Sequence, residues 1–245
     1  MNWKKALVII GICLLVGYLI FAAFYFEDKP KDGVCTDMQI SFDNNGNEKF
    51  LEAEDIEGYL TKKGCNPKGK YFEDINTDSI ESVILTNKMI KKAEVYVTAN
   101  GIIKVNIFER KPILRVIANS GENYYVDDEG KRMPVSSRHT PYLPIATGNI
   151  KEDFACNDLY TFARFLQGDK FWNAQIEQIV IAPNEDITLI PRVGNHEIIL
   201  GKIEGYQKKL DKLLTFYQNG LNETGWNKYS VINLKYDKQV VCKKR

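Results

Sequence analysis

The chain has 245 residues, of which 44% are hydrophobic and 27% are charged, and its 33 basic and 32 acidic residues leave a net charge of +1. These fractions are ordinary for a globular protein, and the length allows one or two domains after the first 30 residues. The balanced charge excludes the concentrated basic surface that general nucleic-acid binding needs.

Residues 6–26 (ALVIIGICLLVGYLIFAAFYF) contain no charged side chain. As a helix they would be about 30 Å long, which is enough to cross a bilayer. Two lysines precede the run and two acidic residues follow it, so the positive-inside rule leaves residues 1–5 as a short cytoplasmic tail and exports the rest. The alternative is a cleaved signal peptide, but its apolar region is normally shorter. We therefore predict a single-pass protein of the cytoplasmic (inner) membrane.

Four cysteines lie beyond the predicted span, namely Cys35, Cys65, Cys156 and Cys242. No C-x-x-C pair occurs, which argues against a zinc ribbon or a thioredoxin-type redox site. The sequence does not decide whether these four cysteines form disulfides or are buried free thiols. If one bridge forms, we expect Cys35–Cys65, because the start of the first strand and the end of the first helix can meet at one edge of a small domain.

After a polar linker at 27–33, residues 34–110 alternate between strand and helix patterns. The second helix is expected around Ile80, Val83 and Ile84. Asn100-Gly101 between two β-branched runs predicts a tight hairpin in which both turn residues reach positive φ. The predicted order is strand, helix, helix, strand, strand. The first strand lies at 34–42, the first helix at 52–63, and the last two strands at 94–99 and 102–108.

Residues 111–245 read as a mixed, mainly antiparallel β-rich domain with two or more helices, so the fold class is α+β. Three prolines at 134, 141 and 144 mark an irregular stretch. Strands are predicted at 113–118, 123–127, 175–182, 186–193, 196–200 and 229–242, the last broken near Asp237-Lys238, and helices at 158–167 and 203–218.

No catalytic constellation is visible. The only histidines, His139 and His196, are far apart and lack metal-ligand spacing, and no nucleophile elbow, zinc-protease or phosphate-loop motif occurs. The acidic pairs at 54–55 and 127–128 fall at a helix start and in a turn, where acids serve local structure. We predict no enzyme activity, no cofactor and no metal.

Four segments together resemble the FtsQ/DivIB family of bacterial cell-division proteins: 107–115 (IFERKPILR), 124–134 (YYVDDEGKRMP), 143–148 (LPIATG) and 232–241 (INLKYDKQVV). The order of parts is also similar over the whole chain, from a short tail and one span to a POTRA domain and a β-rich domain. Two departures are the tail of about five residues, shorter than in many members, and Lys235, which stands where the family's last motif has an arginine. That substitution weakens any expectation of a bidentate ion pair.

The resemblance implies a non-catalytic scaffold that gathers at the division site and binds the small bitopic proteins FtsB and FtsL. It leaves open contacts of the POTRA domain with other division proteins. It also implies that the final strand is an edge to which a partner adds a strand. The matching positions are Lys235, Tyr236, Asp237, Lys238, Val240 and Val241. Inward packing is the alternative for Tyr236 and Val240, and protection of the edge is the alternative for Lys238.

Glu109, Arg110 and Pro112 lie at the domain junction, where we expect a structural role. Two other functions remain open. One is a POTRA-bearing protein of export or outer-membrane biogenesis, although one POTRA unit and no run of barrel strands argue against it. The other is a membrane-anchored enzyme, which would need a cleft containing an acid with a perturbed pKa.

Overall fold

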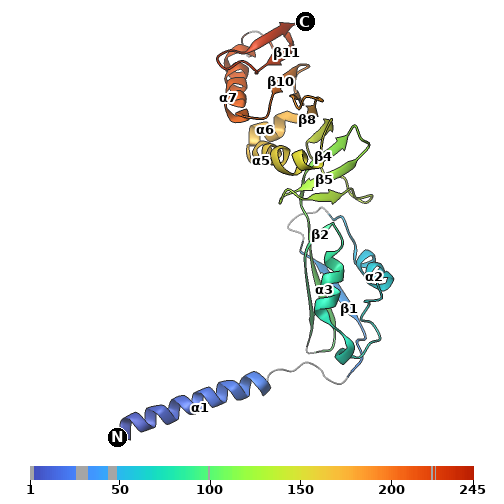
Figure 1. Cartoon of the computed structure of the whole chain (residues 1–245), viewed down its shortest axis with the longest axis vertical. Coiled ribbons are helices and arrows are strands. Elements are labelled where there is room, and N and C mark those ends of the chain that lie inside the picture. The colour runs from blue at the N-terminus through green and yellow to red at the C-terminus, as the bar shows by residue number, and fades with distance from the viewer. Residues whose placement is uncertain (1–2, 26–32, 44–48, 99, 222, 224) are drawn as a thin grey trace. The chain divides into compact units, whose positions relative to one another are not determined.

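The computed structural model of the protein describes residues 3–25, 33–43, 49–98, 100–221, 223 and 225–245. These residues group into two compact units (Figure 1). One is formed by the described parts of 1–43, 52–87 and 92–108, and the other by the described parts of 44–51, 88–91 and 109–245. The predicted linker at 27–33 lies outside the described residues apart from Gly33.

Helix α1 (Trp3–Tyr25) begins three residues before the predicted span at 6–26 and covers all of its described residues. Its side chains are described for Trp3 and residues 10–21, and all of these are exposed. Taking the described residues alone, no helix reaches the length and apolar character that a bilayer crossing requires. The membrane span therefore stays a prediction.

The first unit has the predicted order of strand, helix, helix, strand, strand. Its three-stranded sheet has the order β1-β3-β2, and β1 runs parallel to β3. The elements are β1 (Met38–Phe42), α2 (Ala53–Lys62), the short 3₁₀ helix η1 (Phe72–Asp74), α3 (Thr77–Leu85), β2 (Ile90–Val97) and β3 (Ile103–Glu109).

Hydrophobic periodicity explains this core. Alternate residues of β3 are buried, as expected for a strand with one inward face. Each helix buries two residues four positions apart, which lie on one side of a helix. The buried side chains are Ile103, Val105 and Ile107 in β3, Ile56 and Leu60 in α2, and Ile80 and Ile84 in α3.

The hairpin between β2 and β3 differs from the prediction in its turn. Gly101 has a φ of +70°, but Asn100 is not among the described residues with positive φ. Thr98 N–H donates to Ile102 O at 2.9 Å, and Gly101 N–H donates to Thr98 O at 3.0 Å. Among the described residues of this turn, Gly101 holds the left-handed position, which glycine adopts without steric cost.

The expected Cys35–Cys65 disulfide is absent, and both residues are free thiols. Cys35 is buried, and its Sγ donates to Asp37 O at 3.4 Å. Cys65 is half-buried, and its Sγ donates to Lys63 O at 3.6 Å. Each thiol thus has a local backbone acceptor, and burial raises the pKa of Cys35.

The second unit is built on a nine-stranded sheet of order β12-β11-β10-β9-β8-β7-β4-β5-β6. The strands are β4 (Pro112–Ala118), β5 (Asn123–Asp127), β6 (Arg132–Pro134), β7 (Ile145–Gly148), β8 (Ile176–Ile181), β9 (Ile187–Pro191), β10 (Glu197–Gly201), β11 (Tyr229–Asn233) and β12 (Val241–Lys244). The helical segments are α4 (Glu152–Phe154), η2 (Ala155–Leu159), α5 (Tyr160–Gly168), α6 (Lys170–Gln175), α7 (Tyr206–Phe216) and η3 (Tyr217–Leu221).

Most strand neighbours are antiparallel, as predicted, but β4–β7, β7–β8 and β10–β11 are parallel. The sequence did not predict β6, β7 or α6. Strand β7 follows Pro144 directly, inside the stretch expected to be irregular, and it lies between β4 and β8. A strand of four residues with neighbours on both sides is defined by its pairing more than by its own pattern.

One face of this sheet is covered by α5, α6 and α7, which lie along the same side in Figure 1. Residues from six adjacent strands form a fully buried row under these helices: Val116, Ala146, Ile179, Leu189, Ile198 and Ile232. On the opposite face, Tyr125 and Met133 pack with Phe50 in a second, smaller core. Residues 49–51 therefore belong structurally to this second unit.

Candidate functional site

The predicted partner-binding residues lie around the last hairpin of the sheet. The predicted strand at 229–242 is two antiparallel strands, β11 and β12, joined by residues 234–240. In the register, Asn233 pairs with Val241 and Ile232 with Cys242. Strand β12 stands at the end of the strand order, so the final strand is an edge strand, as the resemblance implied.

The six predicted residues differ in exposure. Lys235, Tyr236, Asp237 and Lys238 are exposed in the connecting segment, and Tyr236 keeps 50% of its surface accessible. Val241 begins β12 with 42% of its surface accessible. In contrast, Val240 is half-buried against the main core, which fits the inward packing considered for it.

Lys235 is held by an ion pair within the same unit. Its Nζ lies 2.9 Å from Asp186 Oδ2, just before β9. The hydrogen bond from Lys235 lowers the pKa of Asp186, and the carboxylate in turn raises the pKa of Lys235. The contact has one donor nitrogen, unlike the fork that an arginine could form at this position.

Lys212 of α7 holds the segment between β11 and β12. Its Nζ donates to Leu234 O at 3.3 Å and also to Tyr236 O. The backbone N–H of Leu234 donates to Ile199 O at 2.9 Å, which continues the pairing of β10 with β11. These bonds fix the start of the segment against the helix and the sheet.

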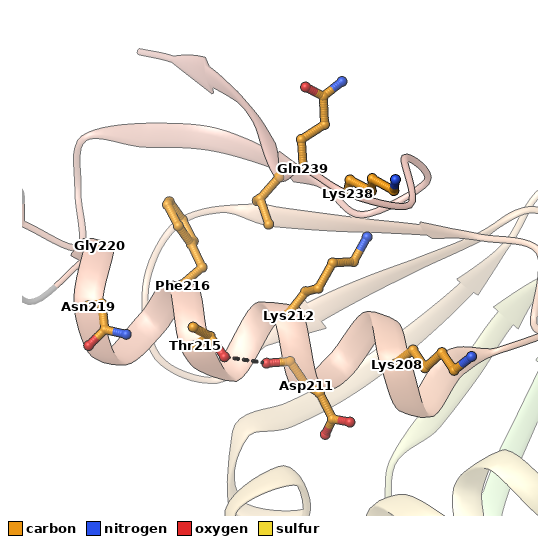
Figure 2. A pocket seen from close by; sticks show the side chains of 10 residues that line it. Lys208, Asp211, Lys212, Thr215, Phe216, Asn219, Gly220, Lys238 and Gln239 are labelled. Atoms are coloured by element: carbon orange, nitrogen blue, oxygen red, sulfur yellow. Dashed lines mark hydrogen bonds between the residues drawn. The ribbon is translucent and has the colours of Figure 1, made fainter.

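A groove of about 680 Å³ separates α7 and η3 from residues 238–240. In Figure 2, Lys212 and Phe216 project from α7 towards the segment that carries Lys238 and Gln239, whereas Asp211 projects away from it. The lining comprises Lys208, Asp211, Lys212, Thr215, Phe216, Asn219, Gly220, Lys238, Gln239 and Val240. Of the predicted site residues, Lys238 and Val240 reach this groove, whereas Lys235, Tyr236, Asp237 and Val241 are not among its lining.

The groove was not predicted from the sequence. The sequence predicts a helix over 203–218, but it does not indicate the groove beside that helix. The signal available in the sequence was the four-residue spacing of Lys208, Lys212 and Phe216, which places an aromatic residue on the same side of the helix as two lysines. Gly220 makes room for this ring, because a Cβ there would lie 2.8 Å from Phe216 Cδ2.

At the predicted junction, Glu109 and Arg110 are structural, as expected. Glu109 is 7% exposed, and its Oε1 accepts hydrogen bonds from the N–H groups of Phe50 at 3.0 Å and Leu51 at 2.8 Å. Arg110 Nη1 lies 2.6 Å from Oδ2 of Asp127, which is fully buried. Pro112 begins β4 opposite Asp127.

The acidic turn at 127–130 also has local partners, as the sequence indicated. Asp127 Oδ1 accepts from the backbone N–H groups of Glu129 at 2.9 Å and Lys131 at 2.8 Å. Hydrogen bonds from Lys131 and Lys91 lower the pKa of Glu129 to about 2. The carboxylates are used in turn geometry and ion pairing, as acids in turns commonly are.

His196 is a buried structural residue. Its Nε2 lies 2.8 Å from Tyr217 Oη, and its ring packs near Trp226. Burial, with a smaller contribution from Arg245, lowers the pKa of His196. Within the described part of the chain, no group of three or more His, Cys, Asp or Glu residues is placed to hold a metal ion.

Two family models match the chain. Residues 33–108 match a POTRA-like domain, and residues 111–243 match the model described as FtsQ/DivIB, C-terminal related. The chain is also similar to the cell division protein FtsQ of Rhodothermus marinus, with 24% identity over 199 residues that cover 76% of this chain and 72% of the relative. Because the second family model alone spans more than half of the chain, this protein belongs to the FtsQ/DivIB family of cell-division proteins.

Proposed function

We propose that this protein is a non-catalytic, membrane-anchored scaffold of the bacterial division machinery that binds small bitopic partners of the FtsB and FtsL type. Membership of the FtsQ/DivIB family supports a role in cell division. The proposal that partners bind to this protein rests on one observation, the position of β12 at the end of the nine-stranded sheet.

An edge strand offers unpaired backbone N–H and C=O groups to an incoming strand. Strand β12 has four residues, and two of them, Lys243 and Lys244, are exposed lysines of the kind that discourages unspecific pairing. Such an edge favours a partner whose side chains fit the residues beside β12 in addition to pairing with its backbone. Tyr236 and Val241 supply exposed apolar surface beside it.

The proposed anchor is the apolar run at 6–26, with the N-terminus in the cytoplasm and residues after the span exported. Two observations support this anchor. The run contains no charged side chain, and every described side chain of helix α1 is exposed. An exposed helix of apolar side chains is costly in water and favourable in lipid. Its role would be to hold the two folded units near the membrane where bitopic partners also reside.

Co-purification tests the proposal. The full-length protein, expressed as the sole copy in its own cells, is purified from solubilised membranes as wild type, as Tyr236→Ala/Val241→Glu, and as a matched control, Tyr142→Ala/Val193→Glu. The control changes the same residue types at exposed positions, since Tyr142 and Val193 are 82% and 58% accessible. FtsB- and FtsL-like proteins are expected with wild type and control, and recovery with the edge variant should fall by about tenfold or more.

Equal recovery with all three proteins would show that the edge is not the docking site. Recovery of no division protein with wild type would remove the scaffold function and favour export or outer-membrane biogenesis. Depletion of the protein separates these functions independently. A division scaffold predicts filamentous cells, whereas an export role predicts a permeable envelope.

A further inference from the structure

Tyr142, in the loop before β7, is an exposed aromatic residue on a restrained backbone. It keeps 82% of its surface accessible, the largest fraction among the described large hydrophobic side chains. The flanking residues Pro141 and Pro144 are buried and have restricted φ angles, and Leu143 packs against the smaller core of the second unit. A side chain that is already held in place loses little conformational freedom when a partner binds to it.

Arg192 holds the ring of Tyr142 in position. The guanidinium carbon of Arg192 lies 4.1 Å from the centroid of that ring. Arg192 follows β9, whose residues alternate between buried and half-buried, so it lies on the same side of the sheet as Thr188 and Ile190, opposite the helices.

The guanidinium group of Arg192 lacks a counter-charge. Among the described residues it forms no ion pair, and its buried Nε has no hydrogen-bond acceptor. A planar cation stacked on an aromatic ring presents its remaining N–H donors in a fixed orientation. The stacked pair can therefore bind a carboxylate without having to rearrange first.

Apolar surface lies beside this pair. Val193, the next residue after Arg192, keeps 58% of its surface accessible. Ile145, Gln178 and Ile190 form a row across β7, β8 and β9, and all three are half-buried. Strands β7 and β8 are parallel neighbours, and parallel strands are usually covered on both faces of a sheet.

The pair lies away from the proposed docking edge. In the strand order, β9 is separated from β12 by β10 and β11. The segment at 234–240 lies at the end of the sheet where β9 begins, because Lys235 pairs with Asp186 there. Arg192 lies where β9 ends.

We infer that Tyr142, Arg192 and Val193 form a second interaction surface, which binds a segment of a partner protein that has a carboxylate next to an apolar side chain. The carboxylate pairs with the guanidinium group of Arg192 through two parallel hydrogen bonds. The apolar side chain covers the ring of Tyr142 and the side chain of Val193. Tyrosine and arginine dominate the binding energy of many interfaces when a partner excludes water from them.

A defined peptide tests the inference on the full-length protein in a neutral detergent. The probe is a short fluorescent peptide with a central Asp flanked by Leu residues in a Gly-Ser context. One comparison peptide has Asn in place of Asp, and another has Ser in place of Leu.

The surface is changed by the single substitutions Arg192→Gln, Arg192→Lys, Tyr142→Ala and Val193→Glu. The matched controls are Arg164→Gln and Tyr96→Ala, which change exposed residues on α5 and β2. Thermal unfolding of each variant shows whether it is folded. Val193→Glu keeps the stacked pair intact and places a negative charge beside it, so it tests the surface even if Arg192→Gln fails to fold.

The acidic peptide should bind wild type and both controls. Arg192→Gln, Tyr142→Ala and Val193→Glu should each weaken its binding by about tenfold or more, and Arg192→Lys by less, because lysine keeps the charge but loses the fork. Both comparison peptides should bind about tenfold more weakly than the probe. Equal binding of the Asp and Asn peptides, binding of neither, or unchanged affinity in the folded surface variants would each overturn the inference.

Other occupants of the surface give different results. A wild-type dimer in sedimentation that becomes a monomer with Arg192→Gln would assign the surface to a second copy of the chain. Binding of glycerol phosphate that Arg192→Gln abolishes, without binding of the peptide, would assign Arg192 to a lipid headgroup. Either result would overturn the inference.

Co-purification separates this surface from the proposed function. Recovery of FtsB- and FtsL-like proteins should be unchanged by Arg192→Gln, because the substitution lies away from β12. Its loss with Arg192→Gln would place those proteins on this surface and overturn the inference of a second site. Its loss with Tyr236→Ala/Val241→Glu alone would support two separate surfaces.

Discussion

Arg110 and Asp127 form a short ion pair in the second unit, with 2.6 Å between Nη1 and Oδ2. The carboxylate of Asp127 is fully buried, and the arginine side chain is 16% exposed. The other oxygen of Asp127 accepts two backbone N–H groups of the turn after β5. One buried carboxylate therefore joins the segment before β4 to the turn between β5 and β6.

Asp127→Asn should destabilise the second unit by about 3 kcal/mol, because it removes the fully buried partner of Arg110 and leaves Glu129, 3.4 Å from Arg110 Nη1, as the remaining counter-charge. Thermal unfolding of the full-length protein measures the change. Asp128→Asn is the matched control, since Asp128 pairs with Lys91 at 3.3 Å in a half-exposed position. It should cost less than about 1 kcal/mol, and an equal loss in both variants would contradict this assignment.

Lys212→Met should loosen the segment between β11 and β12. The substitution keeps most of the aliphatic chain but removes the donor to Leu234 O and Tyr236 O. Hydrogen exchange of amides in 234–240 should accelerate by about tenfold, because charged donors contribute more than neutral ones. Lys208→Met on the same helix should leave exchange unchanged, and acceleration in both would point to a general effect on α7.

Gly148→Ala should be among the most damaging single-methyl additions in the second unit. Gly148 has a φ of +112°, and a Cβ there would meet the backbone oxygen of Ile181 at 2.1 Å, where parallel strands β7 and β8 pair. Strain and backbone displacement should cost about 3 kcal/mol or more. Gly121→Ala, at a φ of +90° with nothing within 4 Å, tests the strain alone and should cost about 1 kcal/mol.

His196 should make the protein less stable in mild acid. Burial lowers its pKa below the ordinary value of 6.5. The unfolded chain then binds a proton more readily than the folded one, so the stability that neutral His196 provides is complete above pH 6.5 and is lost as the pH falls. Thermal unfolding between pH 7.5 and 5 measures this loss.

His196→Gln is the comparison for that titration. The variant should be less stable than wild type at neutral pH, because Tyr217 Oη loses its partner on His196 Nε2. It should also lose less stability between pH 7.5 and 5. An acid-induced loss equal to that of wild type would assign the pH dependence to other groups.

The sequence by itself determined the elements whose residues have strong local patterns. The alternation in β3 and the helical spacing in α2, α3 and α7 depend on neighbours only a few positions away. The family was also recognisable from four short segments, because they follow one another in the order that is typical of the family.

Only the tertiary structure decided the features that join distant parts of the chain. Strand β7 exists because β4 and β8 pair with it on both sides, and residues 49–51 join the second unit through Glu109 and the core of Tyr125 and Met133. The groove needs α7 and residues 238–240 to lie side by side, and the pairing of Lys235 with Asp186 spans 49 positions. Such contacts depend on strand order and register, which local periodicity does not encode.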